Sequence, residues 1–248
     1  MTKIKWIIGL IIVSGLCSCN KTHLTDCFKN TGEKTIETRS LPWFNNVKLY
    51  DNVNLVISQG NEASCKVETG KNLLSGITTT VDWQGNLEIR NTNTCNWVRS
   101  YDNPLTVYLQ VKRLDTLVYR SIGDVNTIDT LFLDTLVINL YEGAGRVDLV
   151  VRANLLTAAL HYGTQELVVS GRCGVAYVYS ASFGLVDTRE LYASLMYVNN
   201  KSANDVYVRA SEVLGATIEG LGNIYYYGDP PVVGFIKQGS GELIHLTP

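Results

Sequence analysis

The chain has 248 residues, of which 46% are hydrophobic and 18% are charged, and its formal net charge is −2. This balance fits one large domain or two small ones with a real hydrophobic core, and it excludes a largely disordered chain. Lysine and arginine are scattered thinly, so the sequence has no basic stripe that could neutralise a row of phosphates. We therefore expect no nucleic-acid partner.

The first 18 residues have the features of a lipoprotein signal peptide. Lys3 and Lys5 precede an apolar run, residues 6–13, that is too short to cross a bilayer. Leu16-Cys17-Ser18-Cys19 resembles the lipobox of bacterial lipoproteins, with the small Ser18 directly before the lipid-bearing Cys19. Lipidation at Cys17 would place Leu16 where a small side chain is needed, and plain secretion is the other alternative. We expect a lipid-anchored protein of the cell envelope, held in the outer membrane.

Residues 19–40 are polar and lack sustained periodicity, which is typical of a tether between the lipid and a folded domain. From residue 41 onward, short apolar alternations are broken by Gly, Asn and Asp, as in consecutive β-strands. We divide this domain, residues 41–248, into an N-terminal part over 41–113 and a repeating part over 114–248.

The repeating part carries one turn and one aliphatic residue at a regular interval. Each turn is rich in Gly, Ser, Asn or Asp, and the aliphatic residues that follow are about 18 to 22 positions apart, the length of one solenoid coil. Such coils stack at about 4.8 Å, so the aliphatic residues would share one core. The repeat predicts an all-β, right-handed β-solenoid, with a β-sandwich as the alternative. The predicted inward positions are Val125, Val147, Leu167, Val186, Val206, Ile224 and Leu243.

Two stretches resemble the head GIN domain of the auto-transporter adhesin family. The first is Phe44-Asn-Asn-Val47 with Asn54-Leu-Val-Ile-Ser-Gln-Gly60, and the second is Gly220-Leu-Gly-Asn-Ile-Tyr-Tyr-Tyr-Gly-Asp-Pro230 with Gly239-Ser-Gly-Glu-Leu243. The resemblance covers residues 41–248 and implies a β-solenoid with an adhesive or surface-binding role. It carries over no catalytic residue. The turns at 182–185 and 202–205 hold at most one glycine, so their coils should be less regular.

Residues that could support catalysis or metal binding are dispersed. His23, His161 and His245 lack the spacing of metal ligands. The Gly-x-Gly elements at 143–145, 220–222 and 239–241 precede strands rather than helices, which favours tight turns with glycine at positive φ over phosphate-binding loops. We expect no metal, no cofactor and no enzymatic activity. The alternative, a polysaccharide-processing enzyme on the same scaffold, would need an acidic groove with basic neighbours on adjacent coils.

An acidic stretch could bind calcium or supply paired carboxylates, but Asp at strand ends more often caps its own turn. The four residues of this stretch are Asp115, Asp124, Asp129 and Asp134.

Tyrosine gives the candidate binding face, with 14 Tyr against 5 Phe in the chain. Several tyrosines stand at similar offsets before the repeated aliphatic residue, so stacked coils would align them. The alternatives are a ladder that only stabilises the sheet and a flat aromatic surface for a glycan, matrix or envelope protein. The face comprises Tyr119, Tyr141, Tyr162, Tyr179, Tyr225 and Tyr227.

Four cysteines would remain once Cys17 is removed and Cys19 is acylated. Cys65 shares a strand face with Ala63 and Val67, which indicates a buried thiol. Cys27 and Cys95 lie in irregular polar segments that can adopt disulfide geometry, whereas Cys173 lies inside a repeat. We expect a Cys27–Cys95 disulfide, and peptide mapping without reduction that found Cys27 free or bound to Cys173 would contradict it.

The signal sequence predicts that the mature protein begins at an acylated Cys19. Each buried methylene of the acyl chains contributes about 0.8 kcal/mol, so the protein should partition into membranes and Cys19→Ala should release it. Mass spectrometry of the N-terminal peptide measures the modification. An unmodified Cys19 in the mature protein would show that the anchor is absent.

Overall fold

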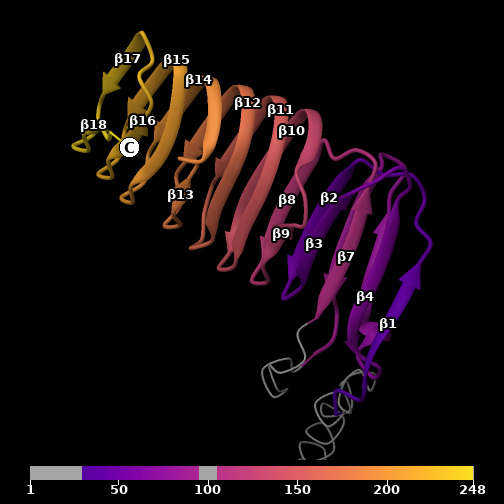
Figure 1. Cartoon of the computed structure of the whole chain (residues 1–248). Helices are drawn as coiled ribbons and strands as arrows, with labels where there is room; N and C mark the ends of the chain where they lie inside the picture. The colour runs from indigo at the N-terminus through magenta and orange to yellow at the C-terminus, as the bar shows by residue number, and fades with distance from the viewer. Residues whose placement is uncertain (1–29, 95–104, 248) are drawn as a thin grey trace, which may run out of the picture.

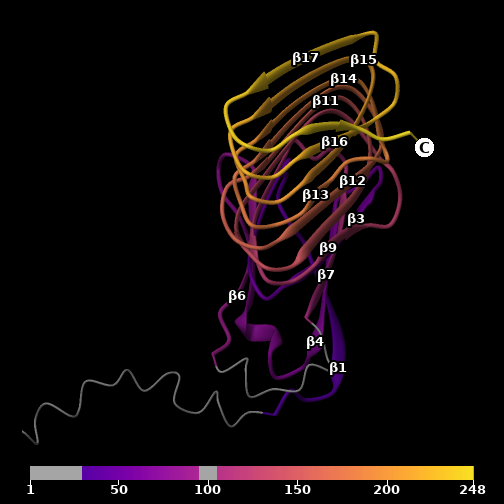
Figure 2. The same ribbon diagram turned by 90° about the vertical axis from the view of Figure 1, so that its left-hand side faces the viewer.

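The computed structural model describes residues 30–94 and 105–247, and these residues form a β-solenoid (Figure 1). The strands belong to one continuous sheet in which neighbouring coils pair in parallel. Viewed along the stack, the coils lie over one another as loops around a common interior (Figure 2). The predicted all-β solenoid is therefore confirmed, and the β-sandwich alternative is wrong.

The C-terminal coils are the most regular part of the stack. Each contains a long strand that bends once, or two shorter strands in its place. At the bend one residue drops out of the pairing ladder, for example between Ala153 and Leu155 on one coil and between Cys173 and Val175 on the next. The strands are β10 (Leu131–Gly143), β11 (Arg146–Leu160), β12 (Glu166–Ser180), β13 (Val186–Asp187), β14 (Leu191–Asn200), β15 (Val206–Ile218), β16 (Ile224–Tyr227), β17 (Val232–Lys237) and β18 (Leu243–His245).

The N-terminal part joins the same stack out of chain order. β2 (Asn46–Asp51) and β3 (Asn54–Gln59) form a coil that pairs with β8 (Thr116–Ser121) and β9 (Val125–Thr127) on one side. On its other side this coil pairs with β6 (Asn86–Asn91) and β7 (Thr106–Val111). The first strands of the domain therefore lie between segments that follow them in the sequence.

Antiparallel strands close the N-terminal end. β4 (Ser64–Gly70) pairs antiparallel with β7, and β5 (Ile77–Val81) pairs antiparallel with β6 after a short 3-10 helix, Leu74–Gly76. β1 (Lys34–Arg39) pairs with β4, although the sequence placed these residues in the tether. β1 is held by backbone hydrogen bonds, and its one aliphatic side chain, Ile36, is 57% exposed, so no apolar periodicity marks it.

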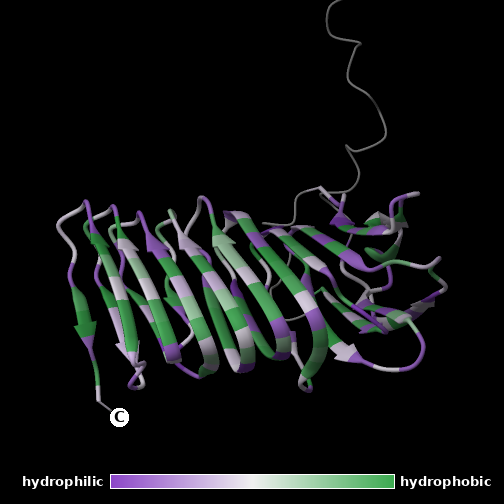
Figure 3. Cartoon of the chain, turned by 90° about the horizontal axis from the view of Figure 1, so that it is seen from above, coloured by the Kyte–Doolittle hydropathy of each residue, from purple (hydrophilic) through white to green (hydrophobic). Residues whose placement is uncertain are grey.

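The predicted inward positions form a single column through the core. Val125 pairs with Val147, and the register continues coil by coil to Leu243. The column also extends toward the N-terminus through Leu55 and Val107, which the repeat did not include. From Val107 to Ile224 its members are fully buried. Along the strands, hydrophobic residues alternate with more polar ones (Figure 3), because alternate side chains point into and away from the core.

The turns stack so closely that glycine is needed for space. A Cβ on Gly222 would lie 2.0 Å from the carbonyl oxygen of Asn204 on the previous coil, and one on Gly241 would lie 2.1 Å from the oxygen of Gly222. Neither glycine has a positive φ, whereas Gly143 does, at 139°. The expectation of positive φ thus holds for Gly143 but not for the Gly-x-Gly turns at the C-terminal end. In those turns glycine is required because two backbones approach each other too closely for a side chain.

Tyr119 corrects the predicted binding face, because it lies in the core and is fully buried. It occupies an inward position on β8, paired with Leu49 and Leu140. Its hydroxyl donates a hydrogen bond to the carbonyl oxygen of Gly123 at 2.8 Å and accepts one from the amide of Gly145 at 3.0 Å. Tyr119 therefore ties two successive turns together. Burial raises its pKa to about 12.

The two ends of the stack differ. β1 at the N-terminal end carries charged side chains, as exposed edges commonly do. β17 at the C-terminal end exposes both of its faces, and its apolar side chains Val232, Val233, Phe235 and Ile236 are 41% to 57% exposed. Among the residues described, no helix is long and apolar enough to cross a membrane.

An aspartate in the inward column should destabilise the fold. Val206→Asp would bury a carboxylate without a partner, and we expect the free energy of unfolding to fall by several kcal/mol in chemical denaturation. Val232→Asp is the matched control, because Val232 is 55% exposed and should tolerate the charge. Equal stability of the two variants would contradict the assigned inward column.

Removing the Tyr119 hydroxyl should cost stability as well. Tyr119→Phe leaves the Gly123 carbonyl and the Gly145 amide unpaired, which we expect to cost about 1–3 kcal/mol. The raised pKa means that folding favours the neutral phenol, so this contribution is lost as the pH rises from 10.0 toward about 12. Denaturation at neutral and alkaline pH measures both effects. Tyr162→Phe, at a 62% exposed position, should change neither, and a loss of stability equal to that of Tyr119→Phe would contradict the assignment.

Candidate functional site

The second half of the C-terminal coils presents a surface without charged side chains. These outward residues follow the parallel register across β10, β11, β12, β14, β15 and β17, and we call this surface the uncharged face. Its members are Thr135, Val137, Asn139, Leu155, Thr157, Ala159, Val175, Tyr177, Tyr179, Leu195, Tyr197, Asn199, Val213, Gly215, Thr217, Val232, Gly234 and Ile236. The first halves of the same coils carry charges such as Arg146, Asp148 and Glu166.

Two tyrosines form the most exposed aromatic feature of the uncharged face. Tyr177 is 46% exposed and Tyr197 is 36% exposed, and they occupy equivalent positions on neighbouring strands. Their rings stack with centroids 5.2 Å apart and planes 16° apart. The next positions along the stack are Gly215 and Gly234, which lack side chains. The Tyr197 ring leans over Gly215, where an added Cβ would lie 2.7 Å from the ring.

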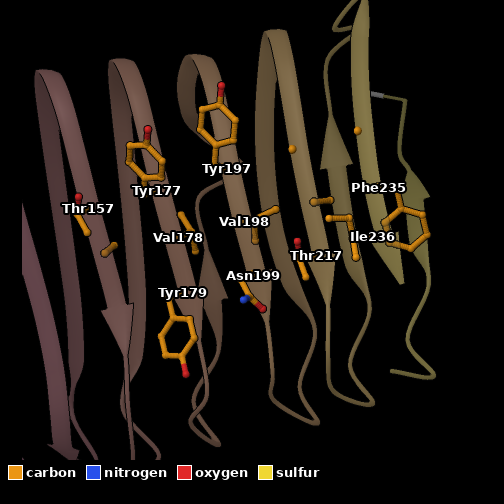
Figure 4. Close-up of a pocket in the computed structure, with 14 residues that line it drawn as sticks. Thr157, Tyr177, Val178, Tyr179, Tyr197, Val198, Asn199, Thr217, Phe235 and Ile236 are labelled. Carbon is orange, nitrogen blue, oxygen red and sulfur yellow. The ribbon is translucent and has the colours of Figure 1, made fainter. Parts of the chain in front are cut away.

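This change from tyrosine to glycine leaves a hollow of about 470 Å³ on the face (Figure 4). Tyr177, Tyr197 and Phe235 supply aromatic surface, while Thr217 and Asn199 supply polar groups. The Asn199 amide nitrogen donates a hydrogen bond to Glu219, but its buried Oδ1 has no partner among the residues described. No Asp, Glu, His, Lys or Arg lines the hollow. The hollow can therefore stack an apolar ring face and receive a hydrogen bond, but it offers no charge.

The remaining predicted tyrosines divide between two clusters. Tyr141 stacks on His161 at 4.5 Å, and Tyr162 and Tyr179 lie 6.1 Å and 5.9 Å from the same imidazole ring. This part of the predicted aromatic ladder exists, but His161 is at its centre. Burial, with a smaller effect of Arg120, lowers the pKa of His161, which favours a neutral ring.

The second cluster lies on the first half of the last coils. Tyr225 stacks on Tyr207 at 5.0 Å, and Tyr227 receives the guanidinium groups of Arg189 and Arg209 at 5.9 Å and 5.4 Å. Tyr225 and Tyr227 are thus separated from the other predicted tyrosines by the bend of the coil. The predicted face is two surfaces rather than one.

Sequence reasoning missed Tyr177 and Tyr197. The predicted face rests on the number of residues between each tyrosine and the repeated aliphatic residue that follows it. A turn of variable length lies between the two, so this number does not report the position of the tyrosine within its strand. Counting within the second half of the coil would have found the pair, because Tyr177 and Tyr197 are 20 residues apart and in register. Gly215 lies 18 residues further on, so the shorter spacing hid its alignment with them.

Three carboxylates of the acidic stretch accept hydrogen bonds from other residues. The Asp124 carboxylate accepts a hydrogen bond from the backbone amide of Arg146 at 2.9 Å, and Asp134 accepts one from the Asn154 side chain at 2.7 Å. Asp115 accepts from Arg113 and Asn45. Within residues 30–94 and 105–247, no group of three or more His, Cys, Asp or Glu is arranged to hold a metal ion.

The histidines and cysteines that the structure describes form no metal-binding group. His245 stacks on Tyr226 at 4.5 Å, far along the stack from His161, and His23 lies outside the described residues. Cys65 and Cys173 are buried and free, and burial raises the pKa of the Cys65 thiol to about 11, so the predicted buried thiol is confirmed. Cys19, Cys27 and Cys95 also lie outside the described residues, so the anchor and the disulfide stay predictions.

Comparison with solved structures supports the fold. A putative adhesin from Bacteroides fragilis NCTC 9343 aligns with a TM-score of 0.79 at 19% identity, covering 86% of this chain and 97% of that one. A putative lipid binding protein from Parabacteroides distasonis ATCC 8503 aligns with a TM-score of 0.62 at 16% identity, covering 87% and 98%. A putative adhesin from the same strain gives 0.62 at 19% identity, with 87% and 98% covered. At these identities the likeness shows a common fold.

Comparison with curated proteins finds no match. A family model described as "Putative auto-transporter adhesin, head GIN domain" matches residues 43–230. This match spans most of the chain. It contains the first of the two resembling stretches and the part of the second that ends at Pro230. The chain therefore belongs to the family described as "Putative auto-transporter adhesin, head GIN domain".

Proposed function

We propose that the mature protein is a lipid-anchored binding module of the cell envelope that holds a neutral glycan on its uncharged face. The observation that carries this proposal is the stacked pair of Tyr177 and Tyr197 beside the hollow over Gly215 and Gly234. Sugar rings present apolar C–H faces that pack on aromatic rings, and their hydroxyls need hydrogen-bonding partners.

The chemistry of the hollow suits a neutral sugar. Its volume of about 470 Å³ falls within the usual range for small-ligand sites. The Thr217 hydroxyl lines the hollow, and it can donate a hydrogen bond to a sugar hydroxyl or accept one from it. The lack of charge keeps the desolvation cost of the protein low. Membership of a family described as a putative auto-transporter adhesin supports a binding role.

A glycan array probed with the full-length protein in detergent tests the proposal. We expect binding to a subset of neutral glycans, and a loss of about tenfold or more in affinity for Tyr177→Ala or Tyr197→Ala, because each removes one stacking ring. Tyr177→Phe should retain most of the affinity, since it keeps the ring.

The control is Tyr162→Ala, which removes an equally large ring at a 62% exposed position outside the hollow. It should bind like the unmodified protein. Absence of neutral-glycan binding, or equal loss in all three alanine variants, would contradict the proposal. Binding to vesicles of zwitterionic lipid without glycan binding would point to a lipid ligand and would also overturn it.

A further inference from the structure

A second row of outward side chains runs along the stack on the first halves of the coils, just before the bend. Register pairs Phe132 with Arg152, Arg152 with Arg172 and Arg172 with Tyr192. Arg209 follows, with its guanidinium 4.7 Å from the Tyr192 ring, and it pairs in turn with Tyr227. We call these six residues the arginine row. It combines aromatic and cationic groups over consecutive coils, with Arg152 and Arg172 next to each other.

Arg152 and Arg172 in this row have no partner among the residues that the structure describes. Both are exposed, and among the residues described neither forms an ion pair, a hydrogen bond or a ring contact. The neighbouring Arg146 differs, because it binds Asp148 at 3.0 Å and Glu166 at 3.1 Å. Two unpaired guanidinium groups on adjacent strands repel each other, so an anion bound between them would relieve an unfavourable contact.

A hollow of about 690 Å³ opens beside these two arginines. Phe132 and Tyr192 line it with exposed rings, at 61% and 54%, and Ser194 and Ser211 add hydroxyl groups. Asp134 is the one carboxylate in the lining, and it already accepts a hydrogen bond from Asn154. The lining therefore combines two free cations and one hydrogen-bonded carboxylate with neutral hydrogen-bonding groups and aromatic surface.

We propose that the arginine row binds a linear acidic polysaccharide lying along the stack. Arg152 and Arg172 would donate charge-assisted hydrogen bonds to its carboxylate or sulfate groups, while its sugar rings would pack on Phe132 and Tyr192. This site is separate from the uncharged face, because the bend of the coil divides them, and it does not depend on the neutral-glycan site.

The spacing of the charges favours a polysaccharide over a nucleic acid. Coils repeat at about 4.8 Å, and the row interrupts its cations with aromatic residues, which matches a polymer with charges on some of its sugars. A nucleic acid carries a phosphate on every nucleotide and is held by many cations, whereas this chain has a formal net charge of −2.

Binding of the full-length protein in detergent to polygalacturonate, dextran sulfate and neutral dextran tests the inference. We expect binding to an anionic polymer that weakens as sodium chloride is added, and none to dextran. The stronger of the two anionic polymers identifies carboxylate or sulfate as the group recognised. Arg152→Gln with Arg172→Gln should lower the affinity about tenfold or more, because two charged hydrogen-bond donors are lost. Tyr192→Ala should weaken it further.

The matched control is Lys48→Gln with Arg90→Gln. It removes the same number of charges from two partly exposed residues that bind Glu88, on the N-terminal part of the stack. It should bind as the unmodified protein does. Thermal melting of both double variants separates loss of binding from loss of fold.

Equal weakening by both variants, equal binding to dextran, or tighter binding to single-stranded oligothymidylate than to either polysaccharide would overturn the inference. Tyr177→Ala should leave this binding unchanged, so failure of one site is distinguishable from failure of the other.

Discussion

Each coil of this solenoid buries its inward side chains against the coils before and after it, so the fold depends on an unbroken parallel register. A single coil is too short to enclose a core, and stability arises from the interfaces between neighbours. The inward column from Val107 to Ile224 is the packing that this register produces. The same register brings the turns into backbone contact, which is why the Cβ atoms that Gly222 and Gly241 lack would have no room. A shift by one residue would turn the core side chains outward and push the turns into one another.

The sequence predicts the fold best where the parallel register joins coils that are consecutive in the chain. Where successive coils are successive in the chain, as from Val125 to Leu243, a constant interval between turn and aliphatic residue was enough to identify the core. The interval does not predict the place of the β2 and β3 coil in the stack. This coil pairs with strands that are separated from it by a long insertion in the chain. β1 gave no apolar signal, since backbone pairing at an edge requires none. Counting residues across a turn of variable length assigns Tyr119 wrongly to the surface. Its position two residues after the buried Leu117, on the same strand, assigns it to the core.

Parallel register also governs the surface, because equivalent side chains of neighbouring coils stand next to one another. Several charged side chains pair with an opposite charge on the adjacent coil, as Arg146 does with Glu166 and Lys201 with Glu219. The uncharged face has no like-charge contacts between coils, because its side chains are threonine, asparagine, tyrosine and aliphatic residues. Exposed ion pairs contribute little to stability, so this arrangement is better explained by avoidance of like-charge contacts than by attraction. Arg152 and Arg172 are an exception, because they place two like charges next to each other on adjacent coils. Their position supports an anionic ligand.

A solenoid surface built in this way favours extended ligands over compact ones. Each outward column repeats one kind of contact at every coil, so a linear polymer parallel to the stack meets equivalent groups at regular intervals, and the first contact raises the effective concentration for the next. Individually weak contacts, such as one tyrosine ring or one guanidinium group, can then add to a useful affinity. The bend of the coil keeps the uncharged face and the arginine row apart, and one short domain can offer two chemically different tracks. Loss of a side chain from the middle of a track should therefore weaken binding more than loss from its end, because it divides the remaining contacts.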